Sequence, residues 1–310
     1  EDVDSGQDVQ GTFPSGDVFL DASSPQALTS TTRRFVELLF GNDFRTPTVD
    51  EFGMFVAFGA ARRSADLGRQ VGAAILDQDG NVICVGTNEA PKAHGGAYWE
   101  DDPLDGRDFQ IGIDSSYQRR AQLLSDILSR LGTMNWLSRA ASRRSIDSLV
   151  DEALHGSSRT LRDAQLMDVI EFGRSVHAEM LAITDAAARG VSIKGATLYS
   201  TTFPCHNCAR HIISSGIAKV VYIEPYPKSL AQELFRDSIT VDPVTDSQQM
   251  VTFRPYVGIG PRIYADLFTA SERRSADGTP SRHSCARPSL CETPAGDRNM
   301  SPPGCAGIFR

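Results

Sequence analysis

The spacing of apolar positions changes several times along the chain, and each change predicts a different kind of element. Across 30–58, apolar residues recur at three- and four-residue intervals, which predicts two helices. Two short apolar runs follow, over 71–76 and 82–85, and the Asp-Gly pair between them favours a β-hairpin turn. Residues 86–96 have the glycine and proline content of a loop, and such loops at strand ends often hold ligands.

From residue 176 onward, helical and strand periods alternate regularly. The pattern predicts helices over 177–189 and 205–215, strands over 196–201 and 219–223, and a further helix from about Ser229. Strands that alternate with helices of this length form βαβ units and a parallel sheet. Together with the hairpin, they predict an α/β fold with three layers, in which a mixed sheet of about five strands is flanked by helices.

Three other stretches lack this alternation. Residues 1–26 are polar, so we expect a linker or at most a lead-in strand there. Arg, Leu, Ser and Ala dominate 105–173 at helical spacing, which favours an insertion of surface helices and also allows a lid or regulatory element. The segment 271–310 has scarcely an apolar run, so we expect a disordered tail. The folded domain is therefore expected to span 27–270.

Composition and charge narrow the classes of function. The chain has 31 Lys+Arg and 39 Asp+Glu, a net charge of −8, which disfavours a protein that binds nucleic-acid phosphates. No apolar run approaches the roughly 18 residues of a membrane span, and no secretory signal is visible. Six cysteines are too few for a disulfide scaffold of this size, so we expect a reducing, cytoplasmic location.

Two short motifs carry the candidate chemistry. His177 and Glu179 form an H-x-E motif, and Cys205 and Cys208 form a C-x-x-C pair after a proline. One imidazole and two thiolates suit Zn²⁺ and leave its fourth tetrahedral position open. An open position is typical of a catalytic site. We therefore expect His177, Cys205 and Cys208 to bind Zn²⁺ and Glu179 to transfer protons.

The combination of H-x-E with P-C-x-x-C is a general signature of zinc-dependent base deaminases. Several further segments of the chain accompany these two motifs. Residues 63–66, 70–73 and 86–91 are similar to the R-S-x-D, Q-V-G-A and G-Y-N-G-x-P elements of deoxycytidylate deaminases, and 197–205 is similar to their last strand before the metal. On these segments the chain resembles the deoxycytidylate deaminase family of the cytidine deaminase superfamily. The resemblance implies a cytidine-deaminase-like three-layer sandwich, hydrolytic deamination and a homo-oligomer.

Finer features of the resemblance concern the substrate. Phe203 stands where tRNA-adenosine and guanine deaminases usually carry Glu, which favours free nucleotides over nucleic acid. Segments 222–229 and 253–262 resemble the deaminase half of anti-phage dCTP deaminases, in which a P-loop kinase-like half comes first. The chain has no G-x-x-x-x-G-K-[ST] motif, so we expect these 310 residues not to include that half.

The function implied is zinc-dependent deamination of dCTP, dCMP or both to dUTP and dUMP, which would deplete dCTP in anti-phage defence. The alternatives are a housekeeping dCMP deaminase and a deaminase of bases in nucleic acid. A catalytically silent, oligomeric regulatory protein is a third alternative, and the intact Glu179 argues against it. The sequence leaves open the choice between dCMP and dCTP, the regulation, the oligomeric state and whether the chain is a fragment.

The resemblance also implies that Asn88 holds the deoxyribose hydroxyl, although an Asx turn in a Gly/Pro loop explains this residue as well. We expect phosphate contacts from Arg63, Lys92 and Lys228, each of which also fits a solvated surface charge. Other histidines and the tail cysteines receive no metal role, because none has a motif position or a short C-x₂₋₄-C spacing: His94, His206, His211, Cys285, Cys291 and Cys305.

Overall fold

The computed structural model describes residues 9–156, 161, 164–241, 249–270 and 273–280. The chain divides into two compact units: one contains the N-terminal residues up to Ser15 and Phe52–Tyr256, and the other contains Gly16–Glu51 and the residues from Val257 onward. The domain boundaries at 27 and 270 stay predictions. The segment 281–310, with the three tail cysteines, lies outside the described residues.

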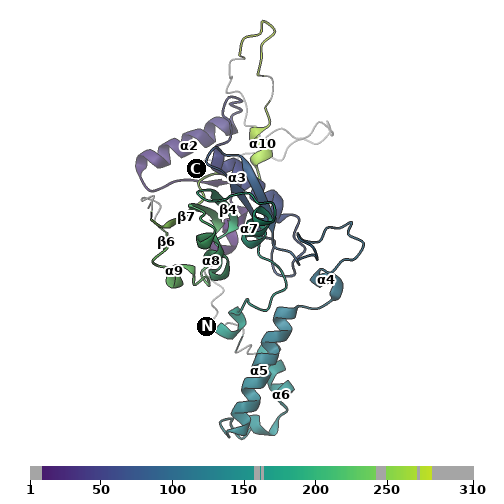
Figure 1. The fold of residues 1–310 in the computed structure, drawn as a ribbon. Coiled ribbons are helices and arrows are strands. Elements are labelled where there is room, and N and C mark those ends of the chain that lie inside the picture. The colour runs from purple at the N-terminus through teal and green to yellow at the C-terminus, as the bar shows by residue number, and fades with distance from the viewer. Residues whose placement is uncertain (1–8, 157–160, 162–163, 242–248, 271–272, 281–310) are drawn as a thin grey trace, which may run out of the picture. The chain divides into compact units, whose positions relative to one another are not determined.

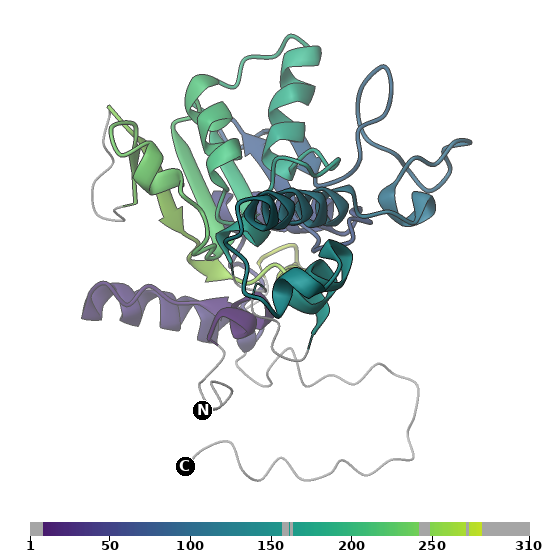
Figure 2. The same cartoon turned by 90° about the horizontal axis from the view of Figure 1, so that it is seen from below.

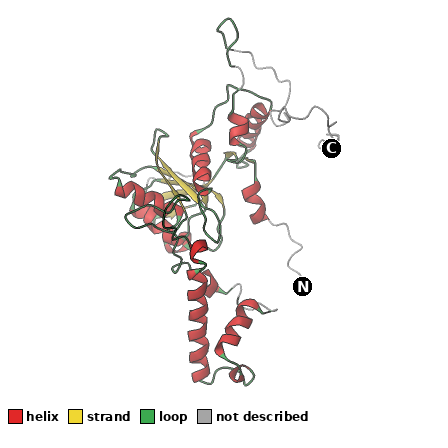
Figure 3. Cartoon of the chain, turned by 90° about the vertical axis from the view of Figure 1, so that its right-hand side faces the viewer, coloured by secondary structure: helices red, strands yellow, loops and turns green. Residues whose placement is uncertain are grey.

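The larger unit is built on a six-stranded mixed sheet (Figures 1 and 3). Across the sheet the strands are β3 (Val82–Thr87), β2 (Gly72–Leu76), β4 (Thr197–Thr202), β5 (Lys219–Glu224), β7 (Val251–Pro255) and β6 (Ile239–Thr240). β2 is antiparallel to both β3 and β4, whereas β4, β5, β7 and β6 are parallel. The predicted fold class and hairpin are confirmed. The sheet has one strand more than the five or so expected, because a two-residue strand such as β6 is too short to show a period.

Helices cover both faces of this sheet. The α-helices of the unit are α1 (Val9–Thr12), α3 (Val49–Ala61, from Phe52 onward), α4 (Asp108–Ile111), α5 (Ser115–Thr133), α6 (Ile146–His155), α7 (Ala178–Ala188), α8 (His206–Ser214) and α9 (Ala231–Leu234). Short 3₁₀ turns, η2 (Phe13–Ser15), η3 (Ala141–Arg143) and η4 (Gln165–Asp168), lie between them. Within 1–26, where we expected a linker or at most a lead-in strand, the described residues form α1, η2 and the two-residue strand β1 (Val18–Phe19).

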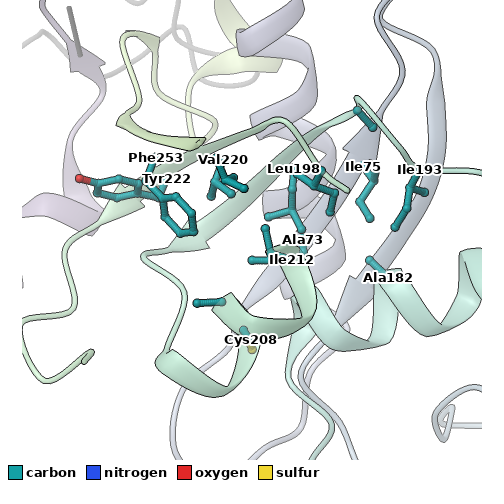
Figure 4. Packing of buried hydrophobic residues seen from close by; sticks show 14 of the residues in the cluster. Ala73, Ile75, Ala182, Ile193, Leu198, Cys208, Ile212, Val220, Tyr222 and Phe253 are labelled. Carbon is teal, nitrogen blue, oxygen red and sulfur yellow. The ribbon is translucent and has the colours of Figure 1, made fainter. Parts of the chain in front are cut away.

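The alternation of side chains along β2 shows how the layers pack. Ala73 and Ile75 belong to one buried cluster with Leu198 of β4 and Ile212 of α8 (Figure 4). Gly72 faces the opposite side, where a Cβ atom would lie 2.0 Å from a carbonyl oxygen of α3. All five residues of β2 are buried. A strand buried on both faces is the centre of a three-layer sandwich, as the sequence predicts.

The insertion between β3 and α7 is helical, as expected. Its two main helices, α5 and α6, lie side by side (Figures 1 and 2). Asp114 caps α5 by accepting a hydrogen bond from the Tyr117 N–H at 2.8 Å, and Tyr117 also bonds His155 at the end of α6. No helix among the described residues is long and apolar enough to cross a bilayer.

The smaller unit has its own core around α2 (Pro25–Leu39), α10 (Tyr264–Phe268) and the antiparallel pair β1 (Val18–Phe19) and β8 (Gly258–Ile259). The buried carboxylate of Glu51 organises it. This group accepts hydrogen bonds from the backbone of Thr48 at 2.7 Å and of Ile259 at 3.0 Å, and it pairs with Arg34 at 2.5 Å. Because every oxygen of this buried charge has a partner, the desolvation cost is offset.

Close packing of α7 on β3 generates the first prediction. A Cβ atom at Gly86 would lie 2.0 Å from the Ala178 carbonyl oxygen, so Gly86→Ala must displace α7 and should lower the free energy of unfolding by about 1–3 kcal/mol. Gly59 lies exposed in α3 with no neighbour within 4 Å, so Gly59→Ala should instead stabilise by about 0.5–1 kcal/mol. Chemical denaturation of both variants measures this difference, and equal stabilities would contradict it.

Candidate active site

The first part of the site lies at the start of α7. His177 immediately precedes the helix with an extended backbone (φ −66°, ψ 152°), and Glu179 lies in the first turn. Two residues separated by one position within a helix point to different faces, but His177 is outside the helix and escapes this restriction. The H-x-E spacing therefore lets both side chains reach one point.

The two cysteines lie at the start of α8, just after β4. Cys205 precedes the first helical residue, and its Sγ accepts a hydrogen bond from the Cys208 backbone N–H at 3.4 Å. The helix expected over 205–215 thus begins one residue later, with Cys205 as its N-terminal cap. This cap keeps both sulfur atoms at the same end of α8.

His177, Cys205 and Cys208 come together between these two helix starts. Nδ1 of His177 lies 3.3 Å from the Sγ of each cysteine, and the three ligand atoms lie within 4.8 Å of one another. Tetrahedral bonds of about 2.3 Å to sulfur and about 2.0 Å to nitrogen place such atoms about 3.5 Å apart. The donor set and its spacing therefore fit zinc, and these three residues would hold it with one position left open.

The Glu179 carboxyl group is buried beside the two thiols. It is 4% exposed, and its oxygens accept hydrogen bonds from the Ser200 hydroxyl at 3.3 Å and the Cys208 thiol at 3.4 Å. Burial raises the pKa of this carboxyl group above its ordinary value, and the nearby Cys205 sulfur raises it further. A buried carboxyl group with a raised pKa beside a group that could hold a metal ion is suited to accept and release protons.

The two thiols differ in acidity. A hydrogen bond from Cys208, together with the neighbouring His177, lowers the pKa of Cys205 to about 4. The same hydrogen bond and burial raise the pKa of Cys208, and the bond with Cys205 raises the pKa of His177 to about 9. The group thus gathers negative charge on sulfur next to a positive partner. A divalent cation would take over the role of these protons and favour the deprotonated form of both thiols.

A pocket of about 320 Å³ opens onto this group, a size suited to a small molecule. Phe203 and Tyr226 supply aromatic surface on its wall. The rest of its lining comes from the loops after α3 and β3, from both ends of the insertion, from the start of α7 and from the segment that joins β4 to α8. These residues are Asp66 to Arg69, Val71, Asn88, Asp108, Asp114 to Ser116, Ile170, Gly173 to Ser175, His177 to Glu179, Thr202 and Cys205. The insertion therefore forms part of the candidate site.

Asn88 lines this pocket, but its amide group also holds the backbone. Its Oδ1 accepts a hydrogen bond from the Val71 N–H, and its Nδ2 donates one to the Arg69 carbonyl oxygen, both at 2.7 Å. A structural role and a position at the pocket thus occur together. Its contact with a sugar hydroxyl stays a prediction.

The structure does not place the three expected phosphate-binding residues in the pocket lining. The Arg63 guanidinium group lies 3.5 Å from the centre of the Trp99 ring, while Lys92 and Lys228 form ion pairs with aspartates at 2.5 and 2.6 Å. Proximity in sequence to the Gly/Pro loop suggested Arg63 and Lys92, but the direction of a side chain depends on the folded loop. Their role in binding phosphate stays a prediction.

Arg69 and Arg174 are the two arginines of the pocket lining among the described residues. The sequence alone did not single out either of them as a site residue. Each stands beside a segment that it did select: Arg69 precedes the Q-V-G-A element, and Arg174 comes three residues before His177. Position beside a motif was thus the available signal. It is weak, because it applies to many surface residues.

The structure thus defines an α/β protein with a buried acid beside a His/Cys/Cys group that fits zinc. Residues 47–224 match the family model for the cytidine and deoxycytidylate deaminase zinc-binding region. Because the match covers more than half of the chain, the chain belongs to this family. The expected family and its zinc cofactor are confirmed, whereas the anti-phage subtype stays a prediction.

Individual relatives are similar over parts of the chain. The deoxycytidylate deaminase of enterobacteria phage T2 is 54% identical over 54 residues, so the match spans 17% of this chain and only 29% of that protein. Human deoxycytidylate deaminase is 24% identical over 226 residues, 73% of this chain and 89% of the human one. A solved dCMP deaminase from cyanophage S-TIM5, in complex with dCMP and dUMP, is 17% identical, with a TM-score of 0.36, and covers 69% of this chain and all of its own.

The assigned ligand set predicts which cysteine the metal needs. Cys208→Ser should lose zinc, because a hydroxyl is a poor zinc ligand at neutral pH and only two good ligands remain. Cys84 is an equally buried thiol on β3, and its Sγ donates a hydrogen bond to the Ala182 carbonyl oxygen. Cys84→Ser should therefore keep its zinc. Metal content by elemental analysis compares the two variants, and full zinc in Cys208→Ser would refute the assignment.

Proposed function

We propose that the chain catalyses the hydrolytic deamination of deoxycytidine nucleotides, with dCMP as the first candidate substrate. The observation that carries the proposal is the meeting of His177, Cys205 and Cys208 with the buried Glu179 in one pocket. Family membership supports the same chemistry, and both the phage and human relatives are named deoxycytidylate deaminases.

In this reaction, water replaces the amino group of cytosine: a bond from C4 to oxygen forms, the bond from C4 to nitrogen breaks, and ammonia leaves. Zinc, when bound, acts as a Lewis acid that lowers the pKa of water to about 7. Glu179 moves the protons. Its carboxylate accepts a first proton from water and delivers it to ring nitrogen N3. It then takes the second proton, which remains on the new C4 oxygen, and delivers it to the leaving amine, so that the C4 carbonyl forms and ammonia departs.

Other side chains prepare Glu179 and the base for this step. The Ser200 hydroxyl donates to Oε1 of Glu179, which orients the carboxyl group. Phe203 lines the pocket and packs edge-on against Tyr222, with ring centres 4.9 Å apart. This contact holds the Phe203 ring in place. We assign it to contact the base. The buried position of Glu179 keeps bulk water away from its carboxyl group.

A second candidate is dCTP, with depletion of dCTP in anti-phage defence as its biological role. The resemblance of 222–229 and 253–262 to anti-phage dCTP deaminases supports this candidate, and it includes Tyr226 of the pocket wall. A homo-oligomer that acts on free nucleotides in the cytoplasm is part of the same proposal.

A product assay decides among these candidates. Purified protein is incubated separately with dCMP, dCTP, CTP, dATP and a cytosine-containing oligonucleotide, and the products are separated by chromatography. Conversion of dCMP or dCTP to the uracil nucleotide supports the proposal and identifies the preferred substrate. Deamination of the oligonucleotide alone would overturn it in favour of a nucleic-acid deaminase.

The role of Glu179 leads to a specific prediction. Glu179→Gln keeps the three zinc ligands and an oxygen that accepts from Ser200, but it removes the proton carrier. We expect normal zinc content with a loss of about 10²- to 10⁴-fold in kcat. Asp185→Asn, an equivalent change at a partly exposed residue in the second half of α7, should leave kcat unchanged. Turnover by Glu179→Gln at the wild-type rate would rule out this mechanism.

A further inference from the structure

A nucleotide substrate brings a phosphate group, and the pocket must meet its negative charge. Among the described residues, two arginines belong to the pocket lining, Arg69 and Arg174. Guanidinium groups suit phosphate because their planar fork of N–H donors matches two phosphate oxygens at once. The surroundings of the two arginines show which of them is available.

Arg174 is already committed to the protein. It forms a close ion pair with Asp108, and its Nη2 donates to the Gly106 carbonyl oxygen at 3.1 Å. Gly106 and Asp108 lie at the beginning of the insertion, and Arg174 lies just after its end. Arg174 therefore fastens the two ends of the insertion to each other where they border the pocket.

Arg69 has much weaker partners. The shortest contact described for its guanidinium group is from Nη1 to Glu224, at 3.4 Å, which is well beyond the 2.7–2.9 Å of strong charge-assisted hydrogen bonds. The group also lies 5.2 Å from the centre of the Tyr226 ring, and its side chain is 47% exposed. Most of its five N–H donors thus have no partner among the described residues.

The backbone that carries Arg69 is nevertheless held firmly. Asn88 bonds both the Arg69 carbonyl oxygen and the Val71 N–H at 2.7 Å, and the Gln70 side chain donates to the Ser64 carbonyl oxygen at 2.8 Å. This bracing leaves the side chain as the movable part. An arginine on a fixed backbone, with a weakly bound head group at the pocket, has the properties of a preorganised anion contact.

We propose that Arg69 binds the 5′-phosphate of the substrate and thereby makes the enzyme prefer nucleotides to nucleosides. The inference rests on the proposed function and assigns the phosphate to Arg69 in place of Arg63, Lys92 and Lys228. Glu224 and Tyr226 are positioning residues. They keep the guanidinium group extended along the pocket wall, and the weak contact with Glu224 gives way when phosphate binds.

The test compares Arg69→Ala with the wild type on dCMP and on deoxycytidine, which lacks the phosphate. One or two lost charge-assisted hydrogen bonds correspond to a fall of about 10- to 100-fold in kcat/KM for dCMP. Turnover of deoxycytidine should not change. For dCMP, the kcat/KM of Arg69→Lys should lie between those of the wild type and Arg69→Ala. Arg189→Ala is the control: this residue is 51% exposed, pairs with one aspartate and lies outside the pocket lining, so both substrates should be unaffected.

A second measurement uses binding and does not depend on turnover. Titration calorimetry follows dCMP binding to Glu179→Gln with and without the added Arg69→Ala change, and inorganic phosphate serves as a competitor. We expect the double variant to bind dCMP about 10- to 100-fold more weakly and to lose competition by phosphate.

Three outcomes separate the explanations. Equal losses on dCMP and deoxycytidine, or unchanged dCMP binding in the double variant, would overturn the role of Arg69. Absence of deamination by the wild type, together with dCMP binding that depends on Arg69, would instead reject the proposed function and leave the phosphate contact in place.

Discussion

The close approach of α7 to β3 is the constraint on which the candidate site depends. At Gly86 the strand has no side chain, and the space that a Cβ atom would need is occupied by the Ala178 carbonyl oxygen. The first turn of α7 therefore lies directly on the sheet. Because His177 and Glu179 belong to this helix start, the depth of the packing sets where the imidazole and the carboxyl group end, beside the cysteines of α8.

This arrangement uses helix starts as holders for reactive groups. The starts of α7 and α8 bring the histidine and the two cysteines together, and the partial positive charge at the N-terminal end of each helix favours thiolate. The buried sheet supplies rigidity beneath them, since its central strand is packed on both faces. Reactive side chains are thus held in place by tightly packed backbone.

The insertion gives the pocket its other wall. Its helices α5 and α6 are joined to each other by Tyr117 and His155, and Arg174 ties its two ends together. A segment that the sequence marks only as helical thus contributes residues to the pocket lining. The contribution comes from its two ends, because these are the parts adjacent to the strands and to α7.

Periodicity and local motifs were enough to predict the mixed sheet, its hairpin and the residues expected to bind zinc. These features depend on short-range patterns: the two-residue period of strands, the helical period, and ligand types set close together at helix starts. The predicted start of α8 was one residue early. Cys205 is the N-terminal cap: it belongs to the sequence pattern of the helix, but its own backbone is not helical.

What only the tertiary structure decided was which charged groups reach the pocket. Arg63, Lys92 and Lys228 lie near the expected loops in sequence, yet their side chains turn to Trp99 or to aspartates, while Arg69 lines the pocket. The direction of a long charged side chain depends on which ring or carboxylate lies nearest to it in space. Trp99 and Asp168 are distant in sequence from Arg63 and Lys228, and Asp102 reaches Lys92 only across the folded loop, so no local pattern of residues contains the information.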